Sequence, residues 1–140
     1  MKKQLLLIVA VLLIANVAFG QGLKKGNLIG IHRIKVVTLK PNVTMGQFET
    51  FYVGKVLPEY EKAWVGLKGY LLRSFKDKNS FAIVWLFESE AARNKYFTAE
   101  DKANELESAA REKVKPIEEE LKKYGTYTVD YKNDDDWVVR

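Results

Sequence analysis

The run from Phe81 to Phe87 constrains the fold of this chain more than any other stretch. It holds seven consecutive apolar residues and lies between a polar segment, residues 76–80, and an acidic segment that begins at Glu88. Seven residues are too few to cross a membrane, and the aromatic and β-branched content favours a strand. Neither face of such a strand is polar, so the rest of the chain must cover both. Because side chains alternate along a strand, the bulky face is Phe81, Ile83, Trp85 and Phe87, and the smaller face is Ala82, Val84 and Leu86.

Residues 1–20 are predicted to be a secretory signal peptide and not part of the fold. Two lysines follow the first residue, an apolar run extends from Leu5 to Ala15, and small residues precede the expected cleavage before Gln21. This is the layout of a bacterial-type leader, and the apolar run is short for a membrane span. An uncleaved N-terminal anchor is the alternative. We therefore expect an exported protein, periplasmic or secreted, with residues 21–140 forming a single domain.

The composition excludes several kinds of site. The chain contains no cysteine, which rules out disulfides, thiol catalysis and thiolate metal sites. Its formal charge is +5, and two of the positive charges belong to the predicted leader. The remaining basic residues are interspersed with acidic ones along the chain, whereas a nucleic-acid groove usually needs a concentrated basic stripe. We predict no nucleic-acid partner, and no membrane contact once the leader is removed.

Helix and strand signals alternate along the rest of the chain. Thr44 and Gln47 form a capping box, and apolar residues then recur at three- and four-residue steps as far as Trp64. Pro58 lies inside this helix and is predicted to distort it near residues 54–57. The predicted strands are residues 28–39, 67–75, 81–87 and 126–131, with a short terminal strand at 137–139, and the later helices are residues 91–97 and a longer helix that ends at Gly125.

This order of elements predicts a ferredoxin-like α+β fold. Two strand–helix–strand units give the order βαββαβ, a four-stranded antiparallel sheet with both helices on one face. The other face is left open. If that face were the bulky one, exposure would forfeit about 1.5–3 kcal/mol per side chain, against a whole-domain stability of about 5–15 kcal/mol. We expect a second copy of the chain to cover it; the alternative is that the segment around Trp137 folds back over the sheet in a monomer.

The sequence resembles the dimeric α/β-barrel superfamily in its order of elements and in two short segments. These are Lys40-Pro41-Asn42-Val43-Thr44, which leads into the first helix, and Phe81-Ala82-Ile83-Val84 followed by Phe87-Glu88-Ser89-Glu90-Ala91-Ala92. That superfamily includes small cofactorless monooxygenases similar to those of antibiotic biosynthesis, haem-degrading enzymes and stress-responsive barrel proteins. The resemblance implies a dimeric α/β barrel, but a shared fold does not transfer an activity.

His32 is the only histidine, and it lies on the first predicted strand. Its ordinary pKa lies near neutrality, which makes it the candidate for acid–base catalysis. A lone histidine does not make a His-rich metal site, so no metal is predicted; the alternative role is that of a hydrogen-bonded strand residue. Two registers stay open. In one, His32 faces the helices with Ile34, while Arg33 and Lys35 point into the interior between two sheets. In the other, His32 lines that interior itself.

Amphipathic side chains on the second and third strands complete the set of candidates. An arginine there could hold a carboxylate, and a tryptophan could stack on a flat ligand. Alternatively, Trp85 is interface core and Arg73 reaches a sheet edge. We assign the smaller face of the third strand to the helices and its bulky face to the dimer. The ligand-binding candidates are His32, Arg33, Lys35, Tyr70, Arg73 and Trp85, and the dimer-interface candidates are Phe81, Ile83, Trp85 and Phe87.

The sequence therefore predicts an exported homodimer that binds a small apolar or aromatic molecule between its two sheets. One alternative is a cofactorless monooxygenase-type enzyme, for which His32 is the catalytic candidate. The other is a purely structural dimerisation module. No cofactor is predicted, although nothing in the sequence excludes haem.

Overall fold

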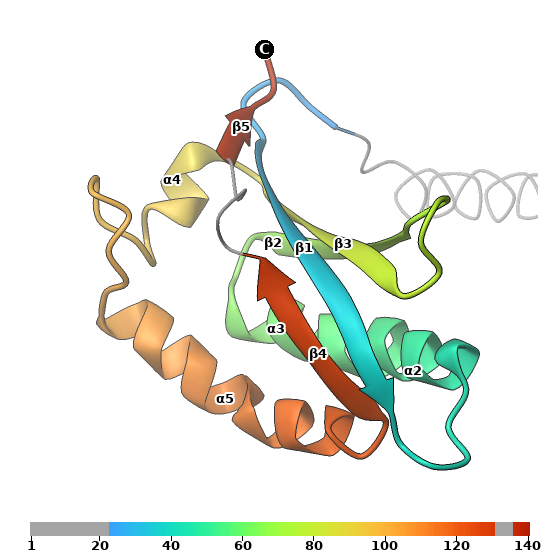
Figure 1. The fold of residues 1–140 in the computed structure, drawn as a ribbon. Helices are drawn as coiled ribbons and strands as arrows, with labels where there is room; N and C mark the ends of the chain where they lie inside the picture. The colour runs from blue at the N-terminus through green and yellow to red at the C-terminus, as the bar shows by residue number, and fades with distance from the viewer. Residues whose placement is uncertain (1–22, 131–135) are drawn as a thin grey trace, which may run out of the picture.

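The computed structural model describes residues 23–130 and 136–140, so the predicted signal peptide lies outside the described residues. The sheet has the strand order β2-β3-β1-β4, with antiparallel neighbours, and a short strand, β5, also pairs with β1 (Figure 1). This order confirms the predicted ferredoxin-like fold, and the predicted terminal strand is present. The strands are β1 (Leu28–Leu39), β2 (Leu67–Arg73), β3 (Ser80–Phe87), β4 (Gly125–Asp130) and β5 (Asp136–Val138).

The long helices lie on one side of the sheet (Figure 1). The first helical segment runs as α2 (Met45–Phe51), the π-helix η1 (Tyr52–Val56) and α3 (Leu57–Ala63), and the second is α5 (Glu105–Leu121). A short helix, α4 (Glu90–Arg93), follows β3. The buried hydrophobic residues form one cluster, contributed by this side of the sheet and by the helices. No helix among the described residues is long and apolar enough to cross a membrane.

The start of the first helical segment and its interruption both follow from the sequence. Thr44 Oγ1 accepts a hydrogen bond from the Gln47 amide at 3.2 Å, and Gln47 Oε1 accepts one from the Thr44 amide at 2.8 Å, which confirms the capping box. The π-helix η1 ends directly before Leu57 and Pro58, where the Leu57 amide bonds to the Tyr52 carbonyl. Since proline lacks an amide hydrogen, the predicted distortion near residues 54–57 is confirmed.

The bulky face of β3 lies against the helices. In the β1–β3 register, Gly30 is opposite Trp85, His32 is opposite Ile83, and the buried Ile34 is opposite Phe81. Paired residues share a face of the sheet. The Phe81 ring packs against Phe48 of α2 with ring centroids 6.2 Å apart. His32 and Ile34 therefore face the helices together, which confirms the first of the two predicted registers.

The prediction for the two faces of β3 is wrong. Phe81, Ile83, Trp85 and Phe87, the predicted dimer interface, belong to the core beneath the helices. Ala82, Val84 and Leu86 lie on the open face, opposite Arg33, Ile31 and Ile29 of β1. The reason is packing: the space between a sheet and its helices must be filled at close-packed density, and large side chains fill it.

Room for the largest of these side chains comes from the neighbouring strand and not from β3 itself. Gly69 of β2 lies opposite Trp85. A Cβ atom at Gly69 would lie 2.7 Å from Trp85 Cζ3 and 2.8 Å from Leu57 Cδ2. The small residue that permits close packing here is thus Gly69, whereas the prediction placed the small residues of β3 beneath the helices.

Three smaller differences concern the ends of elements. The second strand ends at Arg73, and Phe75, predicted to belong to it, is fully exposed in the turn. The helix predicted at residues 91–97 is the shorter α4, although Ser89 caps it by accepting from the Ala92 amide. In α5, the apolar spacing of the helix favours Leu106 on the buried face, but this leucine is 58% exposed.

Candidate functional site

A cavity of about 730 Å³ lies between the helix-covered face of the sheet and the helices. Its walls come from β1, β2, β3 and β4 on one side, from η1, α3 and α5 on the other, and from the segment between α4 and α5 at one end. The lining combines aromatic rings with a set of charged groups. This mixture is typical of small-molecule sites, which are concave, largely apolar and carry a few placed polar groups.

Three stacked rings form the aromatic part of the lining. Tyr60 of α3 stacks on Trp64 with centroids 5.1 Å apart and planes 19° apart, and on Trp85 with centroids 5.0 Å apart and planes 14° apart. Tyr60 and Trp64 meet because residues four apart share a helix face. All three rings line the cavity, and each indole presents an apolar surface on which a flat molecule can stack.

The hydroxyl of Tyr60 ties this stack to α5. Its Oη donates a hydrogen bond to Glu118 Oε1. Burial, followed by the hydrogen bond to Glu118 and the charge of that carboxylate, raises the pKa of Tyr60 above its ordinary value. Tyr60 therefore remains a neutral donor over the physiological range and is not a base. Its chemical part in the site is to hold the Glu118 carboxylate at the edge of the aromatic stack.

The other charged groups come from the end of α4, from the segment between α4 and α5, and from the first half of α5. Arg93, which is buried, forms an ion pair with Asp101, and its guanidinium lies 4.7 Å from the centre of the Phe97 ring. Glu107 is only 2% exposed and pairs with Arg111 one turn further along α5. Buried charges of this kind need partners, and each guanidinium at this end has a carboxylate.

The N-cap of α5 places Glu107 inside the cavity. Asn104 Oδ1 accepts from the Leu106 amide at 2.9 Å and from the Glu107 amide at 3.1 Å. Its Nδ2 donates to the Lys95 carbonyl at 2.7 Å, which fixes the start of the helix against the preceding segment. With its start fixed in this way, α5 presents Glu107 to the sheet and Leu106 to solvent.

His32 and Gly30 form the floor of the cavity on β1. Both face the helices, and His32 is half-buried. The imidazole is the one side chain of the lining whose ordinary pKa lies near neutrality. Gly30 lies opposite Trp85 and contributes no side chain to the cavity.

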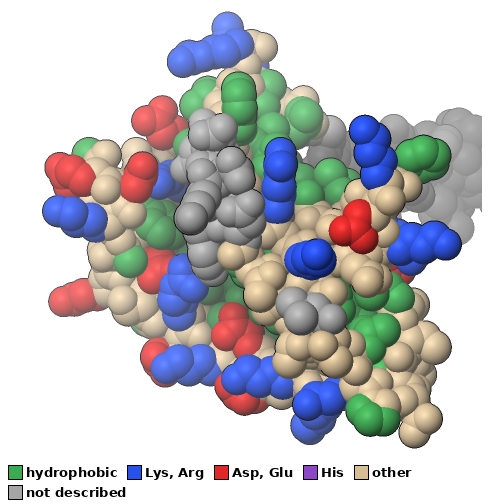
Figure 2. All heavy atoms as spheres, in the orientation of Figure 1, with side chains coloured by type: hydrophobic (Ala, Val, Ile, Leu, Met, Phe, Trp, Pro, Cys, Tyr) green, Lys and Arg blue, Asp and Glu red, His purple; other side chains and the backbone are tan. Residues whose placement is uncertain are grey.

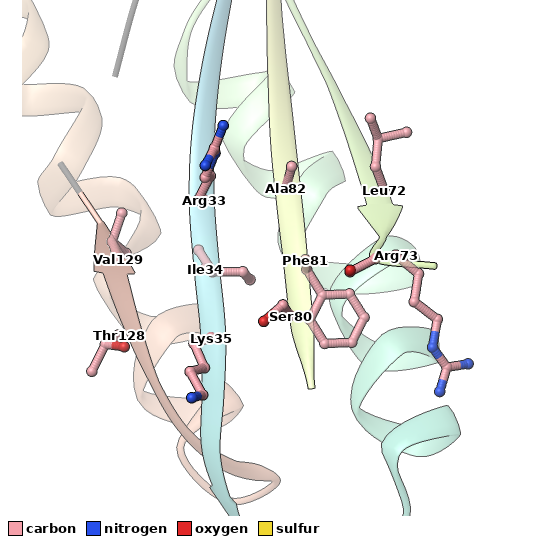
Figure 3. Close-up of a pocket in the computed structure, with 11 residues that line it drawn as sticks. Arg33, Ile34, Lys35, Leu72, Arg73, Ser80, Phe81, Ala82, Thr128 and Val129 are labelled. Carbon is pink, nitrogen blue, oxygen red and sulfur yellow. The ribbon is translucent and has the colours of Figure 1, made fainter. Parts of the chain in front are cut away.

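Arg33, Lys35 and Tyr70 lie on the other side of the sheet, where Arg33 and Lys35 line a shallow hollow of about 780 Å³ on the open face (Figure 3). Arg73 also lines this hollow, but it lies opposite Phe81 of β3 and so shares the helix-covered face. The Arg73 guanidinium turns toward α2, where its Nε lies 3.3 Å from Glu49 Oε1 (Figure 3). Tyr70 is also on the open face, 43% exposed, but it does not line the hollow.

The predicted ligand set is thus divided by the sheet. His32 and Trp85 share the helix-side cavity, Arg33, Lys35 and Tyr70 lie on the open side, and Arg73 lies on the helix-covered side but outside the cavity, where it pairs with Glu49. The prediction that Trp85 lies between two sheets is wrong, because the helices cover this side chain. Figure 2 shows basic and acidic side chains interspersed over one side of the molecule, with hydrophobic ones exposed between them. That view shows no continuous basic stripe.

The sequence analysis missed the charged residues of the cavity, although a signal was present. Glu107 and Glu118 stand eleven residues apart on α5 and share a helix face with Val114 and Leu121. Two carboxylates on an otherwise apolar stripe indicate either an ion pair or a site. Arg93 and Asp101 gave no such signal, because their pairing depends on how the segment between α4 and α5 folds.

No group of three or more metal-ligating side chains lies close together in the part of the chain that the structure describes. The charged groups of the cavity instead pair with one another or with Tyr60.

Comparisons with known proteins give likenesses of fold. No protein-family model matches the chain, and no curated protein matches it. Among solved structures it is similar to SnoaB, a cofactor-independent oxygenase from Streptomyces nogalater, at 14% identity over 82% of this chain and 94% of that chain, with a TM-score of 0.49. It is also similar to a dimeric ferredoxin-like protein from an uncultured marine organism, at 12% identity over 84% and 90% of the two chains, with a TM-score of 0.47.

A third similar structure is a putative antibiotic biosynthesis monooxygenase from Nitrosomonas europaea, at 10% identity over 84% of this chain and 93% of that chain, with a TM-score of 0.44. These are the kinds of protein that the sequence resembles, and the likeness concerns the fold alone. The fold assignment itself stands on the strand order described above.

Proposed function

We propose that this chain is an exported homodimer in which each subunit binds one small, flat molecule in the cavity between its sheet and its helices. The observation that carries the proposal is the cavity itself. Its volume of about 730 Å³ falls in the range of about 300–1,000 Å³ that is usual for small-molecule sites. The ligand lies on the opposite side of the sheet from the inter-sheet position that the sequence predicted.

The lining suits a ligand with a flat apolar body and polar substituents. Trp64 and Trp85 offer stacking surfaces, which contribute about 0.5–1.5 kcal/mol per aromatic pair beyond the burial of area. His32 and the charged groups of α5 are available to orient the polar substituents. A filled, wholly apolar core would need none of these polar groups, and it would leave no space of this size.

The test is a titration of the purified protein with hydroxyarenes, quinones and haem, measured by calorimetry. Any compound that binds should bind more weakly to Gly30→Ala, because a methyl group at this position reduces the space beside Trp85. Gly54→Ala is the matched control, since a Cβ there meets nothing within 4 Å. Arg33→Ala tests the hollow on the open face, and it should leave the affinity unchanged.

Two results would overturn the helix-side site. Loss of affinity in Arg33→Ala with normal affinity in Gly30→Ala would place the ligand on the open face. Failure of every compound to bind, in a protein that is folded and dimeric, would favour the structural dimerisation module.

The dimer is proposed from the open face of the sheet. Apolar side chains occupy one half of it, and these come from four different strands: Ile29 and Ile31 of β1, Tyr70 and Leu72 of β2, Val84 of β3 and Trp137 of β5. Trp137 lies within a strand at the sheet's side and is itself exposed, so it extends the face and does not cover it. A contiguous apolar patch is typical of an interaction surface.

A second copy is the partner that fits this face, because a twofold axis lets one patch cover its equivalent. Light scattering on the protein without its leader should give the mass of two chains. A monomer at all accessible concentrations would remove the dimer from the proposal while leaving the helix-side cavity intact.

Export is proposed from the leader alone. Expression of the full-length chain in a bacterium, followed by mass determination of the periplasmic and medium fractions, should give a product that begins at Gln21. A full-length product that stays with the membrane would instead support the uncleaved anchor.

Oxygenase activity is a second candidate, and the position of His32 in the cavity favours it. The imidazole could accept the hydroxyl proton of a bound hydroxyarene such as 1-naphthol. The ring carbon of the resulting anion would then bond to O₂, and the peroxide would lose one water as its O–O bond breaks. For 1-naphthol the products are 1,4-naphthoquinone and water, and O₂ is the oxidant.

An oxygen electrode tests this candidate. Oxygen uptake in the presence of 1-naphthol should fall at least about 100-fold in His32→Gln, given the usual contribution of a general base. Arg33→Ala, on the other side of the sheet, is the control. Uptake that is the same in both variants would remove His32 from the reaction.

A further inference from the structure

We infer that the helix-side cavity selects a flat organic molecule that carries a positive charge, an inference that rests on the proposed small-molecule site and names its ligand class. The argument begins with the ionisable groups of the lining. They are two guanidinium groups, three carboxylates and one imidazole. Counted without the imidazole, the lining has one carboxylate more than it has guanidinium groups.

The pairing identifies the carboxylate that is in excess. Arg93 forms an ion pair with Asp101, and Arg111 forms one with Glu107. The third carboxylate, Glu118, accepts a hydrogen bond from the neutral phenol of Tyr60. No lysine or arginine within residues 23–130 or 136–140 forms an ion pair with Glu118. Among the described residues, no lysine or arginine thus compensates the negative charge of Glu118 at the cavity wall.

The aromatic rings of the lining differ in whether a protein cation lies over them. At one end of the cavity, the ring of Phe97 already has a protein cation, since the Arg93 guanidinium lies 4.7 Å from its centre. Elsewhere in the lining, no lysine or arginine of the described residues lies over Trp64 or Trp85. Indole faces attract cations, most strongly where water is excluded. One half of the cavity thus combines a carboxylate with two indoles, and both features favour a positive charge.

The lysines of α5 that neighbour Glu118 in the sequence do not neutralise its charge. Lys115 pairs with Glu112, and Lys122 pairs with Glu119 on the exposed side of the helix. The cation has to come from the ligand. An aromatic ammonium, such as an N-alkylated nitrogen heterocycle, supplies the charge and the flat ring together.

Three bicyclic probes of different charge test the inference at pH 8: N-methylquinolinium, quinoline and quinoline-2-carboxylate. Calorimetry should give an affinity at least about tenfold higher for the cation than for neutral quinoline, as expected for a charge near a partly buried carboxylate. The anion should bind most weakly. Glu118→Gln keeps an acceptor for the Tyr60 hydroxyl and removes the charge, so the preference for the cation should disappear.

A control variant separates charge from structure. Glu119→Gln removes a carboxylate from the same helix, but at a residue that does not line the cavity, and it should keep the preference. Thermal unfolding of each variant checks that the fold is retained.

The outcomes separate this inference from the site on which it rests. Equal affinity for the cation and neutral quinoline, or tighter binding of the anion, would overturn the cation preference and leave the small-molecule site standing. The same holds if Glu118→Gln binds the cation as tightly as the unaltered protein does. If none of the three probes binds, and the hydroxyarene, quinone and haem titrations also fail, the site itself is wrong.

Discussion

The two faces of the sheet both carry apolar side chains, yet only one of them is covered by the chain's own helices. The helix-covered face carries the aromatic and bulky residues of β3 and the cavity, and the helices close it. The open face carries smaller residues of β3 together with exposed side chains such as Tyr70 and Leu72, and no helix of the described residues lies over it. The size and type of the side chains on each face thus match what the face packs against: helices on one side, and on the other the second sheet that we propose.

This difference between the two faces bears on where the proposed ligand site and the proposed dimer interface lie. Helices are irregular cylinders, and the space they leave above a sheet is filled by large side chains or remains as a cavity. Two sheets can approach more evenly, so a flat surface of smaller residues suits a second copy of the same sheet. We therefore propose ligand binding under the helices and association on the open face.

The largest effect is expected when one aromatic residue is truncated on each face. Trp85→Ala should destabilise the protein by about 3–5 kcal/mol, because it removes a buried ring from the core. Tyr70→Ala, on the open face and 43% exposed, should destabilise it far less. Urea unfolding followed by circular dichroism measures both. Equal losses would mean that the two faces are equally buried.

A second pair of variants tests how tightly Trp85 is packed. Gly69→Ala should destabilise the fold by about 1–3 kcal/mol, since its Cβ would lie 2.7 Å from the Trp85 ring. Gly54→Ala, where a Cβ meets nothing within 4 Å, should change the stability by less than about 1 kcal/mol. The same urea experiment applies. A neutral Gly69→Ala would show that the ring can move aside.

The open face is tested by a charge. Leu72→Asp should weaken dimerisation at least about tenfold, or about 1.4 kcal/mol, while leaving the monomer folded. Leu106→Asp is the matched control, because this leucine is similarly exposed, at 58% against 52%, but lies on α5. Sedimentation velocity over a concentration series gives the dissociation constants. Equal weakening by both substitutions would exclude the open face as the interface.

The smallest effect is expected at alkaline pH. The raised pKa of Tyr60 means that the native protein keeps a proton that the unfolded chain releases near pH 10.0. The stability from this group is complete below pH 10 and is lost as the pH rises further, by at most about 1.4 kcal/mol per pH unit. Tyr60→Phe should therefore lose stability less steeply above pH 10.

Tyr70→Phe is the control for that measurement, since it removes a hydroxyl from the exposed face. Urea unfolding at intervals between pH 9 and pH 11 gives the slopes. If Tyr60→Phe and the unaltered protein have the same slope, the Tyr60 hydroxyl is not held by Glu118 in solution.

Local signals in the sequence determined most of the fold. The capping box at Thr44 begins the first helix, Pro58 interrupts it, and the bounds of β1 agree with the predicted strand. These features depend on neighbours within a few residues, such as a hydroxyl that accepts from an amide three positions on. The order of elements then leaves few topologies, and the ferredoxin-like arrangement is the one observed.

Only the tertiary structure decided which face of β3 meets the helices. In an apolar strand, polarity does not distinguish the face that joins the core from the face that does not. The outcome depends on Gly69, which lies on another strand and makes room for Trp85. The cavity depends on still more distant partners, since Tyr60 and Glu118 are 58 positions apart in the chain. Alternation along a strand defines two faces, but the helices that pack above them decide which face becomes the core and which is left for a partner.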